Sequence, residues 1–350
     1  MNKKLMKKAE SGDVDAQMRV ANEIIWERNG PIPPAMAERA VRYYKNAAKH
    51  GNQDAMIYLG TMYRWAIGVE RDMDECFAWT KQATARLYPK AYQYLGYHQE
   101  IPVGYADIND DTADYKTVFD CFFKGAMLGD ADCMYKVGDM YFTGKFVEKD
   151  QGFAFYLYAR SAEPSEFPSA SLSLRLGECY YLGLGTEQDI DLAQELLEYA
   201  IEEYEFRLGN EEKSELLMKG YNRAKHLLSS IDEDKIRSRP MCVENHEMQD
   251  EHTALTTSEP CLCTSAHIAC GELGVFFAKG EIVEQDHEQA YKHFAKSALT
   301  RDLARHGSLA NLATMYRKGH CIEVDERFAD YCAEVSMKLE EAWRAEYEKE

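Results

Sequence analysis

The chain has 350 residues and a formal net charge of −19, from 41 Lys and Arg against 60 Asp and Glu. This excess of carboxylates argues against a general affinity for DNA, RNA or anionic membranes, because their phosphates would be repelled. Hydrophobic residues make up 45% of the sequence. That share is enough for a continuous core, so the composition is not that of a disordered chain.

The first segment, MNKKLMKKAESGDVDAQ, begins with basic residues and has no apolar stretch after them. It therefore lacks the hydrophobic region of a secretory signal, and no segment reaches the roughly twenty apolar residues of a membrane span. Ten cysteines are scattered along the chain. Without an export signal, this usage indicates reduced thiols in a core, and we expect a cytoplasmic protein.

The first repeated unit is predicted over residues 9–51, where Asp15 and Ala16 begin a helical pattern. A proline-rich stretch, Pro31–Pro34, takes the place of its turn. Ala40, Tyr43 and Ala47 then resume the pattern as a second helix.

Later units repeat the same residue types at fixed distances from an anchor, which is Gly60, Gly138, Gly177, Gly274 or, in the last copy, Ala313. Three positions after the anchor stand Tyr63, Tyr141, Tyr180, Phe277 and Tyr316. Twelve positions after it stand Asp72, Asp150, Asp189, Asp286 and Asp325, and sixteen after it Cys76, Ala154, Ala193, Ala290 and Ala329. Glycines at six or eight positions complete the pattern.

Each unit is predicted to be helix A, a glycine-bearing turn and helix B. The anchor glycine lies inside helix A, where glycine costs about 1 kcal/mol relative to alanine, so we expect it to permit close approach of the neighbouring helix. The later glycine is typical of the left-handed residue that ends a helix. The aspartate is typical of an N-cap, and Asp72 with Glu75 resembles a capping box.

The unit anchored on Gly96 carries an acidic insertion over residues 101–114. In it, Asp107, Asn109 and Asp111 imitate the first ligands of a calcium loop. Thr112 stands where such a loop needs glycine and Val118 where it needs glutamate, so we reject calcium binding and expect a solvated acidic loop.

Gly274 follows Gly177 by 97 positions, which is too many for one unit. Residues 215–230 have the spacing of a further helix, whereas residues 238–264 are polar, contain Pro240 and Pro260, and have no helical period. We therefore expect repeats over 1–237, an irregular long loop or linker over 238–264, and further repeats over 265–350. A charged helix at the end would cap the stack.

These residues, with the fragments DAMIYLGTMY, GVERDMDECFAWTKQA and KGEIVEQDHEQAYKHFAKSA, resemble the Sel-one-like repeat (SLR) family. The resemblance covers most of the chain. It implies an all-α, right-handed superhelical solenoid similar to tetratricopeptide repeats, and a role as an adaptor.

The long loop and its flank contain several potential zinc ligands: Cys242, His246, His252, Cys261, Cys263, His267 and Cys270. Cys242, His246, Cys261 and Cys263 are the set that would hold zinc. However, no paired Cys-x-x-Cys occurs, and Cys270 falls at a core position of a helix A. We expect no cofactor and no metal, with zinc as the alternative.

No phosphate-binding glycine loop, nucleophile elbow or helical His-Glu zinc motif is present. The aligned aspartates already have a capping role in every unit. We therefore expect that the chain is not an enzyme. A metal-dependent or cell-wall-active enzyme, or a zinc-stabilised repeat protein, is the alternative.

Large, variable residues follow the aligned tyrosine by one or two positions. They include Arg64, Trp65, Phe142, Tyr181 and Arg317. On stacked A helices such residues would line a groove for a protein or peptide, with Trp65, Phe142 and Tyr181 as anchors. The alternative is that they pack against the next repeat.

We therefore expect a non-catalytic scaffold or adaptor that binds a protein partner in its concave face, and no nucleic acid or membrane. A more specific form of the prediction is an acidic inhibitor, such as an immunity protein for a basic toxin, since a charge of −19 would complement such a partner.

Overall fold

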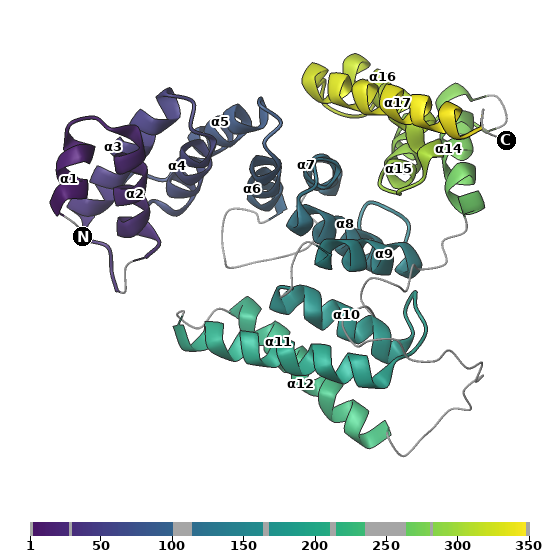
Figure 1. Cartoon of the computed structure of the whole chain (residues 1–350), viewed down its shortest axis with the longest axis horizontal. Coiled ribbons are helices and arrows are strands. Elements are labelled where there is room, and N and C mark those ends of the chain that lie inside the picture. The colour runs from purple at the N-terminus through teal and green to yellow at the C-terminus, as the bar shows by residue number, and fades with distance from the viewer. Residues whose placement is uncertain are drawn as a thin grey trace. The chain divides into compact units, whose positions relative to one another are not determined.

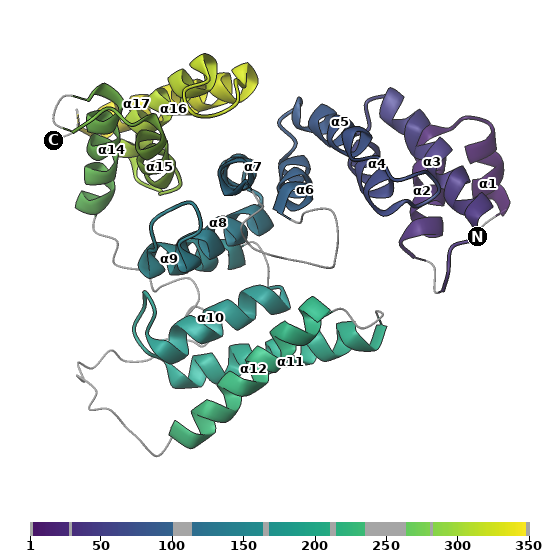
Figure 2. The same cartoon turned by 180° about the vertical axis from the view of Figure 1, so that it is seen from behind.

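The computed structural model describes residues 3–27, 30–100, 114–163, 168–210, 215–234, 264–280 and 283–347. Within these ranges the regular elements are sixteen α-helices and one short 3-10 turn, with no strand. Successive helices pair along the chain, as Figures 1 and 2 show from opposite sides. The predicted all-helical repeat fold is confirmed.

Seven helical hairpins supply the repeats, each with a helix A followed by a helix B. They are α2 (Val14–Ile25) with α3 (Pro34–Lys49), α4 (Gln53–Trp65) with α5 (Met73–Thr84), α6 (Pro89–Glu100) with α7 (Tyr115–Met127), α8 (Ala131–Thr143) with α9 (Gln151–Ala162), α10 (Ala170–Leu182) with α11 (Ile190–Asn210), α14 (Thr264–Lys279) with α15 (His287–Ala298), and α16 (His306–Lys318) with α17 (Glu326–Tyr347). The remaining elements are α1 (Lys3–Glu10), α12 (Glu215–Asp234) and the 3-10 turn η2 (Leu303–Arg305).

All five aligned aspartates cap a helix B, as predicted. Their side chains accept hydrogen bonds from backbone amides two or three residues on, at 2.9–3.0 Å. Their own amides donate to the carbonyl of the aligned aromatic residue, as from Asp150 to Tyr141 at 2.9 Å. The capping-box prediction at Asp72 needs correction, because the Asp72 amide donates to Tyr63 O at 3.2 Å and the aspartate caps without a returning bond from Glu75.

The anchor glycines let helix B approach helix A closely. A β-carbon on Gly60 would lie 2.4 Å from Thr80 Oγ1, and one on Gly138 would lie 2.8 Å from the Tyr158 ring. The turn glycines have positive φ, for example +68° at Gly68 and +79° at Gly144, which glycine adopts without steric cost. The residues sixteen after the anchor, Cys76 and the aligned alanines, are fully buried between the helices.

The chain forms two compact units that interleave in sequence. Unit 1 comprises residues 1–130 and 313–332, and unit 2 comprises residues 131–312 and 333–350. Helices α16 and α17 therefore each contribute residues to both units. The sequence-based arrangement of repeats over 1–237, a loop over 238–264 and repeats over 265–350 stays a prediction. The predicted loop over 238–264 and the acidic insertion lie almost entirely outside the described residues.

Within unit 1, the segment 313–332 packs against α6 and α7, which lie far from it in the sequence. The Phe328 ring lies 6.3 Å from Phe123 and 6.5 Å from Tyr92, and Tyr331 Oη donates to Met127 O at 2.7 Å. Within unit 2, the end of α15 packs in the same way against α9, where Arg160 Nη1 donates to Leu299 O at 2.5 Å. Repeats that are remote in sequence thus stack as neighbours inside each unit.

Across the described ranges, no helix is both long enough and apolar enough to cross a membrane.

Candidate functional site

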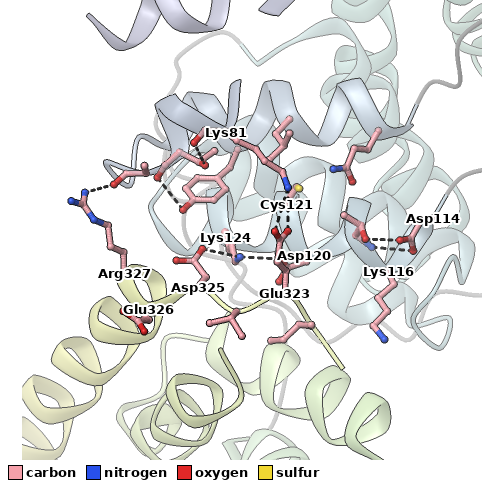
Figure 3. A pocket seen from close by; sticks show the side chains of 18 of the residues that line it. Lys81, Asp114, Lys116, Asp120, Cys121, Lys124, Glu323, Asp325, Glu326 and Arg327 are labelled. Atoms are coloured by element: carbon pink, nitrogen blue, oxygen red, sulfur yellow. Dashed lines mark hydrogen bonds and ion pairs between the residues drawn. The ribbon is translucent and has the colours of Figure 1, made fainter. Parts of the chain in front are cut away.

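A cleft of about 560 Å³ opens in unit 1 between α5–α7 and the segment that leads into α17. Figure 3 shows side chains that line it: Lys81 comes from α5, Asp120, Cys121 and Lys124 from α7, and Glu323, Asp325 and Arg327 from the facing segment. The cleft therefore lies where the remote segment 313–332 docks on the preceding repeats.

Lys124 lies at the centre of this contact, between Asp120 and Asp325. Its Nζ lies 3.0 Å from Asp120 Oδ2 and 3.0 Å from Asp325 Oδ2, and it also lies over the Tyr316 ring, 4.7 Å from the centroid. Tyr316 Oη donates to Asp120 Oδ1 at 2.6 Å. Burial alone would lower the pKa of Lys124, but Asp120 and Asp325 outweigh it and raise that pKa. Lys124 therefore stays charged and acts as a bridge between two carboxylates.

The rim of the cleft is closed by weaker polar contacts. Lys81 Nζ lies 3.3 Å from Glu323 Oε1, with both side chains at least half exposed. Arg327 donates to Ala85 O, the C-cap residue of α5. Because these groups are solvated, their pairing contributes little stability.

The cleft does not place an activated nucleophile among its lining residues. Cys121 lies in its wall, and burial followed by the charge of Asp120 raises the pKa of the thiol to about 12. At neutral pH the sulfur is a thiol, which is a poor nucleophile. The charged groups of Figure 3 are thus arranged for docking one segment on another.

Unit 2 contains a second, smaller cleft, of about 280 Å³, where α15 meets α8 and the turn that leads into α9. Lys296 Nζ lies 2.6 Å from Asp150 Oδ2 and over the rings of Tyr141 and Phe153, at 6.0 and 5.4 Å. Burial would raise the pKa of Asp150, but hydrogen bonds from Lys296 and from backbone amides outweigh it and lower that pKa. The arrangement repeats that of Lys124 in unit 1.

The predicted partner-binding residues divide into exposed and buried ones. Trp65 is 44% exposed, and Arg317 is exposed and paired with Asp330 at 2.8 Å. Phe142 is half-buried beneath the Arg175 guanidinium, 4.9 Å from its ring centroid. Arg64 and Tyr181 are only 4% and 6% exposed, and Arg64 Nη1 donates to His98 O of the next repeat at 2.9 Å. Burial of these two favours the alternative, packing against a neighbouring repeat, while binding by the set stays a prediction.

The structure also shows an aromatic face, of which the sequence analysis identified only Trp65. It consists of Trp26, the C-cap residue of α2, with Tyr58 and Trp65 on α4. The Trp26 and Tyr58 rings lie 5.5 Å apart, and Lys90 Nζ lies 5.5 Å from the Tyr58 centroid. The sequence contained one indication of this face, because Tyr58 and Trp65 are seven positions apart and therefore share a helix face.

The potential zinc ligands Cys242, His246, Cys261 and Cys263 lie outside the described residues, so that alternative stays open. Among the residues that the structure does describe, no group of three or more His, Cys, Asp or Glu side chains is placed to hold a metal ion.

Comparison with known proteins identifies the repeats. The Sel1 repeat model matches residues 14–52, 53–86, 131–163, 173–204, 267–299 and 307–330, more than half of the chain. A Sel1-like repeat-containing protein of Schizosaccharomyces pombe is 30% identical over 115 residues, 32% of this chain. The chain spans only 15% of that relative's length.

Three solved structures with similar helical repeats come from bacteria. A Sel1 repeat protein of Oxalobacter formigenes is 21% identical, with a TM-score of 0.47, over 84% of this chain and 90% of its own. A protective antigen with an SLR fold from uropathogenic Escherichia coli is 21% identical, with a TM-score of 0.45, over 97% of this chain and 64% of its own. An immunity protein from Pseudomonas aeruginosa is 19% identical, with a TM-score of 0.39, over 63% and 83%.

Proposed function

Because the chain belongs to the Sel1 repeat family, we propose that it is a non-catalytic cytoplasmic scaffold that binds a protein segment carrying basic side chains. The observation that carries the proposal is the aromatic face of unit 1. Trp26 and Trp65 on this face are 48% and 44% exposed. Large rings held half-exposed on successive A helices supply contact area at little entropic cost, as binding hot spots do.

The rings of this region already accept cations from the chain itself. Lys90 Nζ lies over Tyr58 at 5.5 Å, Lys45 Nζ over Tyr63 at 5.4 Å, and the Arg64 guanidinium 5.5 Å from the Trp65 centroid. A ring with cations at these distances is suited to Lys and Arg side chains of a partner, since the ring quadrupole attracts positive charge. In a partner segment that alternates basic and apolar residues, the basic side chains would contact the ring faces and the apolar side chains the ring edges.

The distribution of charge favours the same class of partner. Unit 1 holds 20 Lys and Arg against 22 Asp and Glu, whereas unit 2 holds 21 against 38. Nearly all the net negative charge therefore belongs to unit 2. The net negative charge of the chain would attract a basic partner from a distance and speed the encounter, while exposed rings would supply short-range contacts.

Binding can be tested with synthetic peptides in which Lys or Arg flank an apolar residue, compared with versions in which Glu replaces the basic residues. We expect the basic peptides to quench tryptophan fluorescence on binding, and the acidic versions to have no effect. Trp26→Ala and Trp65→Ala should each weaken binding by about tenfold or more. Phe206→Ala, which removes an exposed ring from α11 of unit 2, is the matched control and should leave affinity unchanged.

Equal binding of basic and acidic peptides, or equal loss in the Phe206→Ala control, would contradict the aromatic face as the binding surface.

A more specific form of the proposal is that the chain neutralises a basic protein, as an immunity protein does to its toxin. Long-range attraction between such partners is screened by salt, with a Debye length of about 10 Å at 0.1 M. The association rate should therefore fall steeply as salt is added. A rate that does not respond to salt would count against this form and would leave the scaffold proposal standing.

The absence of catalysis is part of the proposal. It is supported by the pKa values of Cys76, raised to about 11, and of Cys179 and Cys332, raised to about 12, with burial as the largest cause in each. A screen of purified protein against hydrolase substrates, with a measurement of bound zinc, tests this part. Turnover that disappears on removal of zinc would establish the enzymatic alternative.

A further inference from the structure

Lys90 lies among tyrosine side chains of unit 1, at the start of α6. Its Nζ lies 5.5 Å from the centroid of the Tyr58 ring and 3.5 Å from Asp54 Oδ1. Tyr88 Oη donates to the same carboxylate oxygen at 2.9 Å. These four residues, which we call the Lys90 site, bring together one cation, one carboxylate and two phenol rings.

The Lys90 site favours an ammonium group at a position that should disfavour one. Lys90 is the second residue of α6, where the positive end of the helix dipole opposes a cation. Burial would also lower the pKa of Lys90. The surrounding groups outweigh burial and raise that pKa, in decreasing order Tyr58, Asp54, Tyr94 and Tyr88. The chemistry of the site therefore selects a positive charge despite both costs.

Lys90 itself uses the site incompletely. The Lys90 and Asp54 side chains are 37% and 40% exposed, and an ion pair this exposed contributes little stability. Their separation of 3.5 Å is longer than the about 2.7–2.9 Å of a strong charge-assisted hydrogen bond. Within the described part of the chain, both contacts of the Asp54 carboxylate use Oδ1. Oδ2 can therefore accept from an incoming donor, and Lys90 can be displaced at little cost.

The same geometry distinguishes lysine from arginine. A guanidinium binds a carboxylate best when both oxygens accept its two parallel N–H groups. In the Lys90 site, Oδ1 of Asp54 already accepts from Tyr88, which hinders that bidentate pairing. An ammonium needs only one oxygen and a ring face, so the site fits a lysine side chain better.

The Lys90 site adjoins the aromatic face through Tyr58, whose ring lies 5.5 Å from that of Trp26. Trp26 is 48% exposed. A lysine held at Asp54 and Tyr58 would therefore have an exposed indole beside it, on which a neighbouring apolar residue of the same segment can pack.

We propose that the Lys90 site binds a lysine side chain of the partner, whose ammonium replaces that of Lys90 between Asp54 and Tyr58. This proposal rests on the proposed function, because it names the side chain by which the aromatic face holds its partner. Lys90 then acts as a built-in competitor that moves into solvent when the partner binds. Its presence lowers the affinity for the partner and excludes weaker cations.

The peptides of the binding test distinguish this site when they are made in three versions, with lysine, with arginine or with Nε-acetyl-lysine. By calorimetry, the wild type should bind the lysine version about fivefold more tightly than the arginine version, and the acetylated version should not bind. Asp54→Asn, whose amide oxygen can still accept from Tyr88, should lose the preference for lysine.

Lys90→Ala removes the competitor and should bind the lysine version about fivefold more tightly than the wild type. Lys49→Ala is the matched control, because it removes the same charge from an exposed position in the last turn of α3. Equal affinity for lysine and arginine, with Lys90→Ala binding no more tightly than Lys49→Ala, would overturn the lysine site and leave the proposed function standing.

A second test needs no peptide. Butylammonium is the lysine side chain without its backbone, and a ligand that binds only the folded state raises the thermal midpoint. Butylammonium chloride should raise the midpoint of Lys90→Ala above its value in sodium chloride at the same concentration. The shift should be absent in Lys90→Ala/Asp54→Asn. Equal midpoints of Lys90→Ala in the two salts would overturn the site even if basic peptides bind elsewhere, whereas the shift without any peptide binding would support the site and contradict the proposed function.

Discussion

Substitution of Gly60 by alanine tests whether the repeat is built on close approach of its two helices. Gly60 lies inside α4, and a β-carbon there would meet Thr80 Oγ1 at 2.4 Å and Cys76 O at 3.0 Å. The Thr80 hydroxyl cannot move freely, because it is fully buried and donates to Cys76 O at 2.8 Å. Both obstacles belong to α5, so the added methyl would push the two helices of the hairpin apart.

Two opposing effects set the magnitude. Alanine is favoured over glycine inside a helix by about 1 kcal/mol. Against this, overpacking of a tight contact costs about 1–3 kcal/mol, and a displaced buried hydroxyl that loses its acceptor costs a further ~1 kcal/mol or more. The contact dominates, and we expect the free energy of unfolding to fall by about 2 kcal/mol.

Urea denaturation followed by circular dichroism measures this loss. Gly209→Ala is the matched control, because Gly209 lies in helix α11 with no atom within 4 Å of the β-carbon position. That substitution should raise the free energy of unfolding by up to about 1 kcal/mol. The double variant Gly60→Ala/Thr80→Ala removes the nearest obstacle and should recover part of the loss. A Gly60→Ala chain at least as stable as the wild type would refute the close-approach explanation.

Three further predictions concern the caps and the buried ionisable groups. Asp72→Ala should lower the thermal midpoint, since an N-cap is worth about 1 kcal/mol. Asp72→Asn can still accept from the Glu75 amide, so its free energy of unfolding should stay within a few tenths of a kcal/mol of the wild type. Equal losses in both variants would contradict the capping role. Because the pKa of Asp150 is lowered, its contribution to stability is complete above the unfolded pKa of about 3.9 and is lost as the pH falls through the folded value. Below about pH 4, the free energy of unfolding of Asp150→Asn should therefore depend less on pH than that of the wild type. Burial, with the charge of Arg64 as a smaller cause, lowers the pKa of His98 to about 4. Between the unfolded pKa of about 6.5 and this folded value, only the unfolded chain binds the extra proton, so the free energy of unfolding falls as the pH drops through this window. His98→Gln should remove that part of the pH dependence in urea titrations at about pH 7, 6 and 5.

The single repeat was predictable because its interactions are local. The aspartate twelve positions after each anchor reaches an amide only two or three residues away, so the capping prediction depended on no distant part of the chain. The anchor glycine and the buried small residue sixteen positions later belong to the same hairpin, and their spacing was equally readable. Prediction failed at Asp72 for a physical reason: the amide that a capping box would use already donates to Tyr63 O.

The candidate site was less predictable, because exposure depends on which repeats become neighbours. Arg64 and Trp65 are adjacent in sequence, yet Arg64 turns toward His98 and is buried while Trp65 stays half exposed. Variability at these positions could not distinguish the two. Trp26 was missed because it follows the last residue of α2, outside the repeated pattern, and only its 5.5 Å contact with Tyr58 places it on the aromatic face.

The order of stacking could not be read from periodicity, because a repeat pattern describes how each unit folds and implies only that units follow one another. The stacking partner of α7 depends on a residue that the repeat itself does not require. Phe328 occupies a position where other copies tolerate Glu75, Leu192 or Gln289, and its ring meets Phe123 and Tyr92 of the remote repeat at 6.3 and 6.5 Å. Departures from the repeat consensus at a core-facing position are therefore the places to look for contacts between units that are distant in sequence. By the same reasoning, Phe328→Leu should weaken the contact of the 313–332 segment with α6 and α7. It should leave the Asp325 cap intact, because the cap uses the backbone amide of residue 328 and the contact uses its ring.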